Sequence, residues 1–140
     1  MEIQQINKPT KTDTAPLHQA FEQFALRQNP LLIPEDQDKP IFLKIEDDQG
    51  NLLAGLYGNC YWNGLEIDTL WVDEPLRGQG IGKRLVDQAE QYARRQGAVV
   101  SYLKTFDAKH FYEQLGYQVY GELKDRPIGT VLYHMQKRLD

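Results

Sequence analysis

The sequence is poor in the residues that build disulfides and metal sites. It holds one cysteine, Cys60, so no internal disulfide can form and zinc sites that need two or four cysteines are excluded. The three histidines, at positions 18, 110 and 134, lack metal-ligand spacing, and we expect no bound metal. Long apolar stretches are also missing. No run approaches the roughly 20 residues that a membrane helix needs, so a membrane is not an expected partner.

An excess of basic residues is missing as well. The formal net charge of −4 argues against a protein that binds nucleic acid by neutralising many phosphates. The first residues lack the basic and apolar regions of a signal peptide, so the cytoplasm is the expected compartment. The charge is uneven: residues 1–82 carry 6 Lys/Arg against 13 Asp/Glu, and residues 83–140 carry 10 against 7. This asymmetry reflects either a solvated surface or two ligands of opposite charge.

The chain has what one globular domain requires. Its 140 residues, of which 41% are hydrophobic, suffice for one core, and we expect a single domain over residues 1–140. Hydrophobic periodicity and turn residues predict a weak strand at 1–7, a helix with its cap within 12–14 that ends near Asn29, and a loop at 34–40. Three antiparallel strands follow at 41–46, 52–62 and 65–72, and then a helix at 80–96, a strand at 98–103, a helix at 108–115 and strands at 117–123 and 130–137.

The order of these elements predicts the fold class. The strand–helix–strand unit at 65–103 requires a parallel pair with a right-handed crossover. The remaining neighbours are hairpins, which are antiparallel. We therefore expect an α+β, three-layer domain: a mixed, mostly antiparallel sheet with a central βαβ unit and helices on both faces.

The most informative segment joins the strand at 65–72 to the helix at 80–96. It holds Gly78, Gly80 and Gly82, where the backbone can approach a ligand closely. The N-terminus of a helix adds unsatisfied N–H groups and a partial positive charge. Together these features predict a cradle for a phosphate group.

Two common phosphate-binding motifs do not fit. A P-loop needs Gly and Ser or Thr at the positions that Arg77 and Arg84 occupy. A dinucleotide fingerprint needs a different glycine spacing and an acid about 20 residues later, and the strand at 98–103 contains none. A nicotinamide cofactor is therefore disfavoured.

The pattern Arg77-x-x-Gly80-x-Gly82 resembles the coenzyme A pyrophosphate loop of the GNAT superfamily of N-acetyltransferases, Arg/Gln-x-x-Gly-x-Gly/Ala. The segment Phe111-Tyr112-Glu113-Gln114-Leu115-Gly116-Tyr117 is similar to that family's Phe-Tyr-Glu-Lys-Leu-Gly-Phe segment. The separation and the order of elements also match, from about residue 40 to the end, and the chain resembles small stand-alone bacterial members. The resemblance implies a GNAT-like fold, acetyl-CoA as cosubstrate and an amine acceptor, which the acidic half of the chain suggests is cationic. Many members are dimers, so a homodimer is also open.

The resemblance assigns cofactor-binding residues. Backbone N–H groups of the loop would bind the pyrophosphate, and backbone groups of the preceding strand would pair with the pantetheine arm, while the N–H of Val72 could polarise the thioester carbonyl. The charge of Lys83 either assists the phosphates or is simply solvated. The cofactor-binding residues are Leu70, Trp71, Val72, Arg77, Gly78, Gln79, Gly80, Ile81, Gly82 and Lys83.

Two residues are the catalytic candidates. Tyr112 matches the family's tyrosine and would protonate the leaving thiolate, because a phenol stays protonated at neutral pH; the alternative is a core aromatic. Glu66 would accept the proton of the amine, unless a water chain does so. Asp68, on the same face of the strand, and His110 are weaker candidates for that role.

The predicted activity is acetyl transfer from acetyl-CoA to a primary amine of a small molecule or peptide, by direct attack in a ternary complex. Tyr112 is the acid and Glu66 the base of this reaction. The alternative is a non-catalytic module on the same fold that binds coenzyme A as a sensor or for interaction with a partner. A nucleotide-binding protein of the P-loop type is a distant third.

Overall fold

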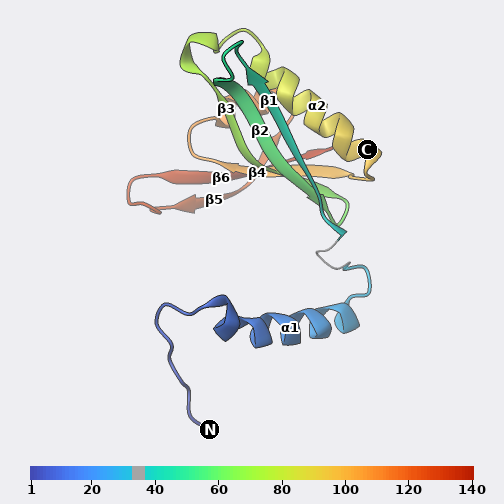
Figure 1. The fold of residues 1–140 in the computed structure, drawn as a ribbon, viewed down its shortest axis with the longest axis vertical. Coiled ribbons are helices and arrows are strands. Elements are labelled where there is room, and N and C mark those ends of the chain that lie inside the picture. The colour runs from blue at the N-terminus through green and yellow to red at the C-terminus, as the bar shows by residue number, and fades with distance from the viewer. Residues whose placement is uncertain (33–36) are drawn as a thin grey trace. The chain divides into compact units, whose positions relative to one another are not determined.

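The computed structural model describes residues 1–32 and 37–140, and the chain divides into two compact units, residues 1–34 and 35–140, which are described separately (Figure 1). The first unit holds helix α1, Lys11–Gln28. Its cap is Thr10, two residues before the predicted segment: the Thr10 hydroxyl accepts from the Asp13 N–H at 3.2 Å, and the Asp13 carboxylate accepts from the Thr10 N–H at 2.8 Å. This reciprocal arrangement is a capping box, which satisfies two backbone donors.

The strand predicted at 1–7 is wrong, because these residues form no strand. A strand needs a partner for its backbone groups, and the described part of this unit offers only a helix whose groups bond internally. Of the loop predicted at 34–40, residues 34–36 lie outside the described residues. Its last two residues, Lys39 and Pro40, instead begin the first strand.

The second unit is built on a six-stranded mixed sheet with the strand order β1-β2-β3-β4-β6-β5. The first three strands form the predicted antiparallel meander, and β3 and β4 are parallel neighbours joined through α2. The mixed sheet with its central βαβ unit is therefore confirmed. The strands are β1 (Lys39–Glu46), β2 (Leu52–Tyr61), β3 (Gly64–Val72), β4 (Val100–Thr105), β5 (Gln118–Lys124) and β6 (Val131–Arg138).

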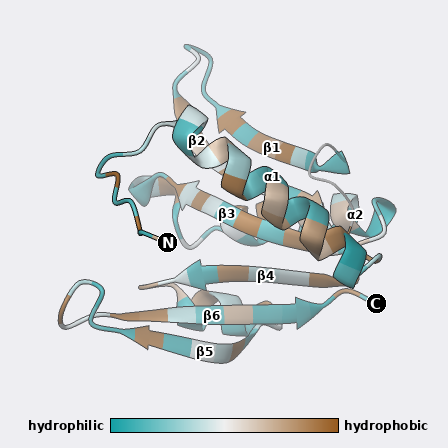
Figure 2. Cartoon of the chain, turned by 90° about the horizontal axis from the view of Figure 1, so that it is seen from below, coloured by the Kyte–Doolittle hydropathy of each residue, from teal (hydrophilic) through white to brown (hydrophobic). Residues whose placement is uncertain are grey.

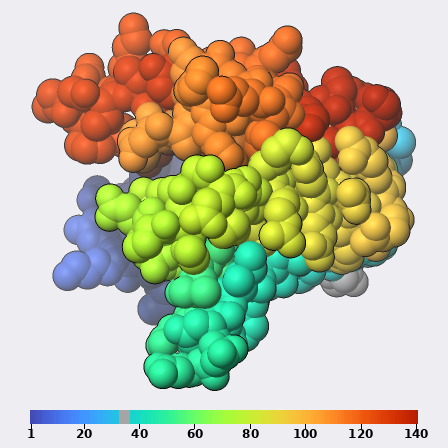
Figure 3. Space-filling model, turned by 90° about the horizontal axis from the view of Figure 1, so that it is seen from above, coloured from blue at the N-terminus to red at the C-terminus, as the bar shows by residue number. Residues whose placement is uncertain are grey.

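Helices α2 (Ile81–Arg95) and α3 (Lys109–Gln114) pack into one core on the same face of this sheet. A Cβ atom added at Gly82 would lie 3.1 Å from the ring of Phe111, so the start of α2 lies directly against α3. Figure 3 shows the yellow-green segment before α2 and the yellow helix itself beside the orange segment that carries α3. A helix on the opposite face stays a prediction, because α1 belongs to the other unit.

Among the described residues, no helix is long and apolar enough to cross a membrane.

Strand β3 carries a β-bulge in its middle. Tyr57 of β2 pairs with Thr69, but the next residue, Gly58, pairs with Ile67, so Asp68 is the extra residue on β3. A bulge bends its strand, increases the local twist and changes the direction in which a side chain points.

Strands β3 and β4 separate at the same place. Their parallel pairing ends at Ile67 and Leu103, whereas β3 continues to Val72 and β4 to Thr105. Figure 2 shows the two strands close at their beginnings and diverging towards their arrowheads. The bend at the bulge accounts for this divergence, and it opens the sheet in its centre.

Candidate active site

Three hollows meet where β3 and β4 diverge. We call them the splay hollow (about 380 Å³), the charged pocket (about 210 Å³) and the aromatic pocket (about 430 Å³). The splay hollow is lined by residues 67–70, 104–108, Tyr112 and Leu132. The charged pocket is lined by residues 66–68, residues 102–104, Tyr120 and His134. The aromatic pocket is lined by Asp38, Tyr57, Asn59, Tyr61, Trp62, Glu66 and Asp68.

The hollows share walls, and one residue lines all three. Ile67, Asp68 and Lys104 line both the splay hollow and the charged pocket. Glu66 and Asp68 line both the charged pocket and the aromatic pocket. A ligand in the charged pocket would therefore lie next to a ligand in the splay hollow, with the bulged residue Asp68 at the junction.

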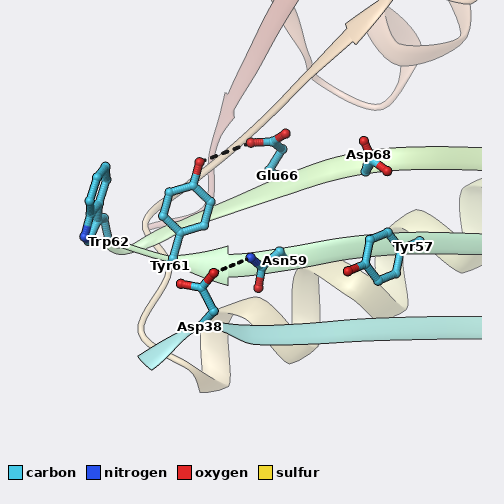
Figure 4. A pocket seen from close by; sticks show the side chains of 7 residues that line it. All are labelled: Asp38, Tyr57, Asn59, Tyr61, Trp62, Glu66 and Asp68. Atoms are coloured by element: carbon cyan, nitrogen blue, oxygen red, sulfur yellow. Dashed lines mark hydrogen bonds between the residues drawn. The ribbon is translucent and has the colours of Figure 1, made fainter. Parts of the chain in front are cut away.

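Glu66 is held by two phenols on the wall between two pockets. Its Oε2 atom accepts from the hydroxyl of Tyr61 at 3.2 Å (Figure 4). The same atom accepts from the hydroxyl of Tyr102 at 2.8 Å. The Tyr102 hydroxyl lies 2.7 Å from that of Tyr61. Burial, followed by these hydrogen bonds, raises the pKa of Tyr102 above its ordinary value, so its phenol remains a donor. No described residue donates to Oε1, so that oxygen can accept a proton from an amine or a water.

Tyr112 lines the splay hollow from α3. Its side chain is 6% exposed, and its ring makes edge contacts with Phe111 and Tyr117 at centroid distances of 5.0 and 5.6 Å. Burial raises its pKa to about 12. Within the described parts of the chain no group hydrogen-bonds its hydroxyl. The side chain is thus both a core aromatic and a protonated donor at the splay hollow. The two roles that the sequence left open for Tyr112, general acid and core residue, are therefore compatible.

The glycine loop has the geometry of an anion cradle. Gly78 and Gly80 both have φ of 81°, a left-handed conformation that favours glycine, and a Cβ at either would meet nothing within 4 Å. Gly80 is the N-cap of α2 and provides no side-chain cap. The N–H groups of Ile81, Gly82 and Lys83 therefore have no partner from the helix and are available to a phosphate, which fits the expected coenzyme A.

The end of β3 has backbone groups that face the region where β3 and β4 diverge. The N–H of Asp73 donates to the carbonyl of Leu53 in β2 at 2.8 Å. Because backbone groups of alternate residues face the same neighbour, those of Trp71 also face β2, and those of Leu70 and Val72 face away from it. Leu70 and the N–H of Val72 thus point to where β4 has left. They are the groups for which the sequence predicts pairing with a pantetheine arm.

The charged residues of the loop have partners within the protein. The Nε atom of Arg77 donates to the carbonyl of Val72 at 2.8 Å and so holds the loop against the end of β3. Lys83 forms an exposed ion pair with Asp87 one turn along α2, at 2.9 Å. This pairing favours the solvated role for Lys83.

Two other candidates lie apart from the hollows. His110 is exposed and lies 3.2 Å from the side-chain nitrogen of Gln114. Cys60 is 5% exposed, and burial raises the pKa of its thiol, which makes it a poor nucleophile. Neither lines any of the three hollows.

Sequence reasoning missed Tyr102 and Lys104 as site residues. The alternation of a strand places both on one face of β4. What the sequence does not contain is the register with β3, which brings Tyr102 opposite Glu66. The positions carry no local motif, so no signal in the sequence singles them out.

The chain is similar to known acetyltransferases in sequence and in fold. The model of the family described as "Acetyltransferase (GNAT) family" matches residues 2–117. A blasticidin-S acetyltransferase of Streptomyces morookaense is 38% identical over 95 residues, which are 66% of this chain and 70% of that protein. A crystal structure of an acetyltransferase from Bacillus cereus has a TM-score of 0.82 at 26% identity and covers 96% of this chain and 97% of its own. An aminoglycoside 6′-N-acetyltransferase complexed with coenzyme A has a TM-score of 0.65 at 20% identity, covering 100% and 98% of the two chains.

Proposed function

Because the chain belongs to the acetyltransferase (GNAT) family and is an acetyl-CoA-dependent N-acetyltransferase, we propose that it acetylates the primary amine of a small molecule or peptide by direct attack in a ternary complex. The observation that carries the proposal is the shared wall of Ile67, Asp68 and Lys104 between the splay hollow and the charged pocket. The acetyl thioester would occupy the first and the amine the second, so that the two reactants meet without a covalent enzyme intermediate.

The acetyl donor binds along the diverged end of β3. The N–H groups at the start of α2 hold the pyrophosphate, and the backbone of Leu70 and Val72 pairs with the amide-bearing arm. The arm thus occupies the strand position that β4 leaves. The N–H of Val72 is then a candidate to stabilise the negative charge that develops on the thioester oxygen.

The reaction needs two proton transfers on opposite sides of the thioester. The amine nitrogen attacks the carbonyl carbon, the C–N bond forms, and the C–S bond breaks with its electrons on sulfur. Tyr112, in the splay hollow, gives its proton to the departing thiolate. Glu66, in the charged pocket, takes the proton that the nitrogen loses, directly or through a water.

Two further observations support the extent of the domain and the kind of acceptor. The family match covers residues 2–117, which span both units, and this supports a single acetyltransferase domain over residues 1–140. Two compared proteins are named for blasticidin-S and for aminoglycoside acetylation, which supports a small-molecule acceptor.

The test measures free thiol released from acetyl-CoA with a panel of primary amines. Tyr112→Phe removes the acid and is expected to lower kcat about tenfold or more, with the Kd for acetyl-CoA unchanged by calorimetry. Tyr92→Phe is the matched control, because Tyr92 lies in α2 and lines none of the three hollows. An unchanged kcat in Tyr112→Phe would remove this residue from the mechanism. Binding of coenzyme A without acetylation of any amine would favour the non-catalytic module.

A further inference from the structure

The parallel pairing of β3 and β4 ends at Ile67 and Leu103, and the next residue on each strand is charged: Asp68 on β3 and Lys104 on β4. Two residues before them, a 2.8 Å hydrogen bond from Tyr102 to Glu66 joins the two strands. Asp68 and Lys104 follow two residues later on each strand, and both line the charged pocket. Although their charges are opposite, they form no ion pair, because the strands have begun to diverge at the bulge.

These two charges also have little compensation elsewhere. The Asp68 carboxylate accepts from the neighbouring Thr69 hydroxyl at 3.3 Å, a long hydrogen bond. The ammonium of Lys104 forms no hydrogen bond or ion pair with any residue of the described ranges. His134 of β6 lies directly opposite Lys104 in the sheet register and also lines the pocket. The charged pocket therefore has a negative wall on β3 and a donor-bearing wall on β4 and β6.

We propose that the charged pocket selects acceptors that carry an acidic group, a carboxylate or a phosphonate, on the same small molecule as the reactive amine. The ammonium would lie against Asp68 beside Glu66, and the acidic group would accept hydrogen bonds from Lys104 and His134. The ligand would thus close the ion pair that the diverging strands leave open. This inference rests on the proposed function, because it names the substrate class of that same reaction.

The size of the charged pocket supports a compact acceptor, and the neighbouring carboxylates support the orientation in which the acidic group faces Lys104 and His134. At about 210 Å³ the charged pocket is smaller than a drug-sized site, which suits a compact amino acid-like molecule. The aromatic pocket beyond it holds three carboxylates, but two already have donors: Asp38 accepts from Asn59 at 2.9 Å, and Glu66 accepts from two phenols. Neutral donors leave these carboxylates charged, so the aromatic pocket would repel the acidic group of the acceptor and direct it to Lys104 and His134.

The experiment compares four primary amines with the same three-carbon chain. They are 4-aminobutanoate, 3-aminopropylphosphonate, propylamine and 1,3-diaminopropane, each assayed by thiol release with the full chain. We expect kcat/KM to be about tenfold or more higher for the acid-bearing amines than for propylamine, because only they accept charge-assisted hydrogen bonds from Lys104 and His134. The carboxylate and the phosphonate arms identify which acidic group fits better.

Variants of Lys104 separate charge from packing. Lys104→Met is expected to lower the ratio of kcat/KM between acid-bearing amines and propylamine about tenfold, and Lys104→Arg is expected to preserve most of it. Lys124→Met is the matched control, because Lys124 ends β5, lines none of the three hollows and should leave the ratio unchanged.

Each outcome decides one of the two proposals. Equal or better turnover of propylamine or 1,3-diaminopropane would overturn the inference and leave the proposed function standing. The same holds if amines of the wider panel are acetylated but the two acid-bearing ones are not, or if Lys104→Met keeps the ratio. If no amine is acetylated while acetyl-CoA binds, it is the proposed function that fails.

Discussion

The ion pair between Lys137 and Glu90 gives a prediction whose size follows from burial. Glu90 lies in α2, the helix that begins at the glycine loop, and its side chain is 3% exposed; Lys137 lies in β6, and its side chain is 23% exposed. Their charged atoms are 2.8 Å apart. The Tyr117 hydroxyl also donates to the carboxylate, at 2.9 Å, and an Arg94 nitrogen lies at 4.0 Å. The pair thus ties the helix of the loop to the far part of the sheet.

Lys137→Met keeps most of the side-chain stem but leaves the carboxylate of Glu90 without its main counter-charge. Breaking a buried pair in this way costs about 3–5 kcal/mol of unfolding free energy, and the distant Arg94 places the expected loss near the lower end, about 3 kcal/mol. The double variant Lys137→Met/Glu90→Gln removes the orphaned charge and keeps an acceptor for Tyr117. It should recover half or more of that loss.

Urea unfolding at pH 7, followed by circular dichroism, measures both values. The matched control is Lys83→Met, which removes the same charge from the exposed pair with Asp87 and should cost about 0.5 kcal/mol or less. The reasoning is refuted if Lys137→Met costs no more than this control, or if the double variant is less stable than the single one.

Two further predictions concern alkaline stability and the glycine loop. Burial raises the pKa of Tyr112 to about 12, and it raises the pKa values of Tyr102 and Tyr117 as well. The stability that these groups contribute is therefore complete below the unfolded pKa of about 10 and is lost as pH rises through the folded values. Unfolding free energy should therefore fall between pH 10 and about 12, by about 2–3 kcal/mol for Tyr112 alone, and a constant urea midpoint over this range would contradict the assignment. Gly80→Ala and Gly129→Ala both place a Cβ at positive φ, 81° and 89°, in open space, and each should cost about 1–2 kcal/mol. Only Gly80→Ala should weaken acetyl-CoA binding in calorimetry, and equal Kd values for the two variants would argue against the anion cradle.

Local patterns in the sequence predicted most of the elements. Leu85 and Ala89 recur at helical spacing in α2, and both are buried in the core. The glycine loop was also predictable, because glycine adopts positive φ without a steric penalty, and both Gly78 and Gly80, just before α2, have positive φ. The segment at 1–7 shows the limit of such patterns, because a short apolar alternation predicts a strand without saying whether a partner strand exists.

The arrangement of the site depended on contacts between residues far apart in the chain. Tyr102 and Glu66 are separated by 36 positions, and Lys137 and Glu90 by 47. Register across a sheet is set by all of its strands together, and no local propensity encodes it. The sequence therefore predicted Glu66 as a candidate base, but not the two phenols that hold it.

The sequence by itself determined the fold class, the glycine loop and the family, because these depend on periodicity, glycine spacing and residues adjacent in the chain. Only the tertiary structure decided where the three hollows lie and which walls they share. A single extra residue, Asp68, forms the bulge at which β3 leaves β4, and this divergence opens the splay hollow and leaves Asp68 and Lys104 unpaired. The physical reason is that a bulge arises from the mismatch between two strands, which neither strand's own sequence expresses.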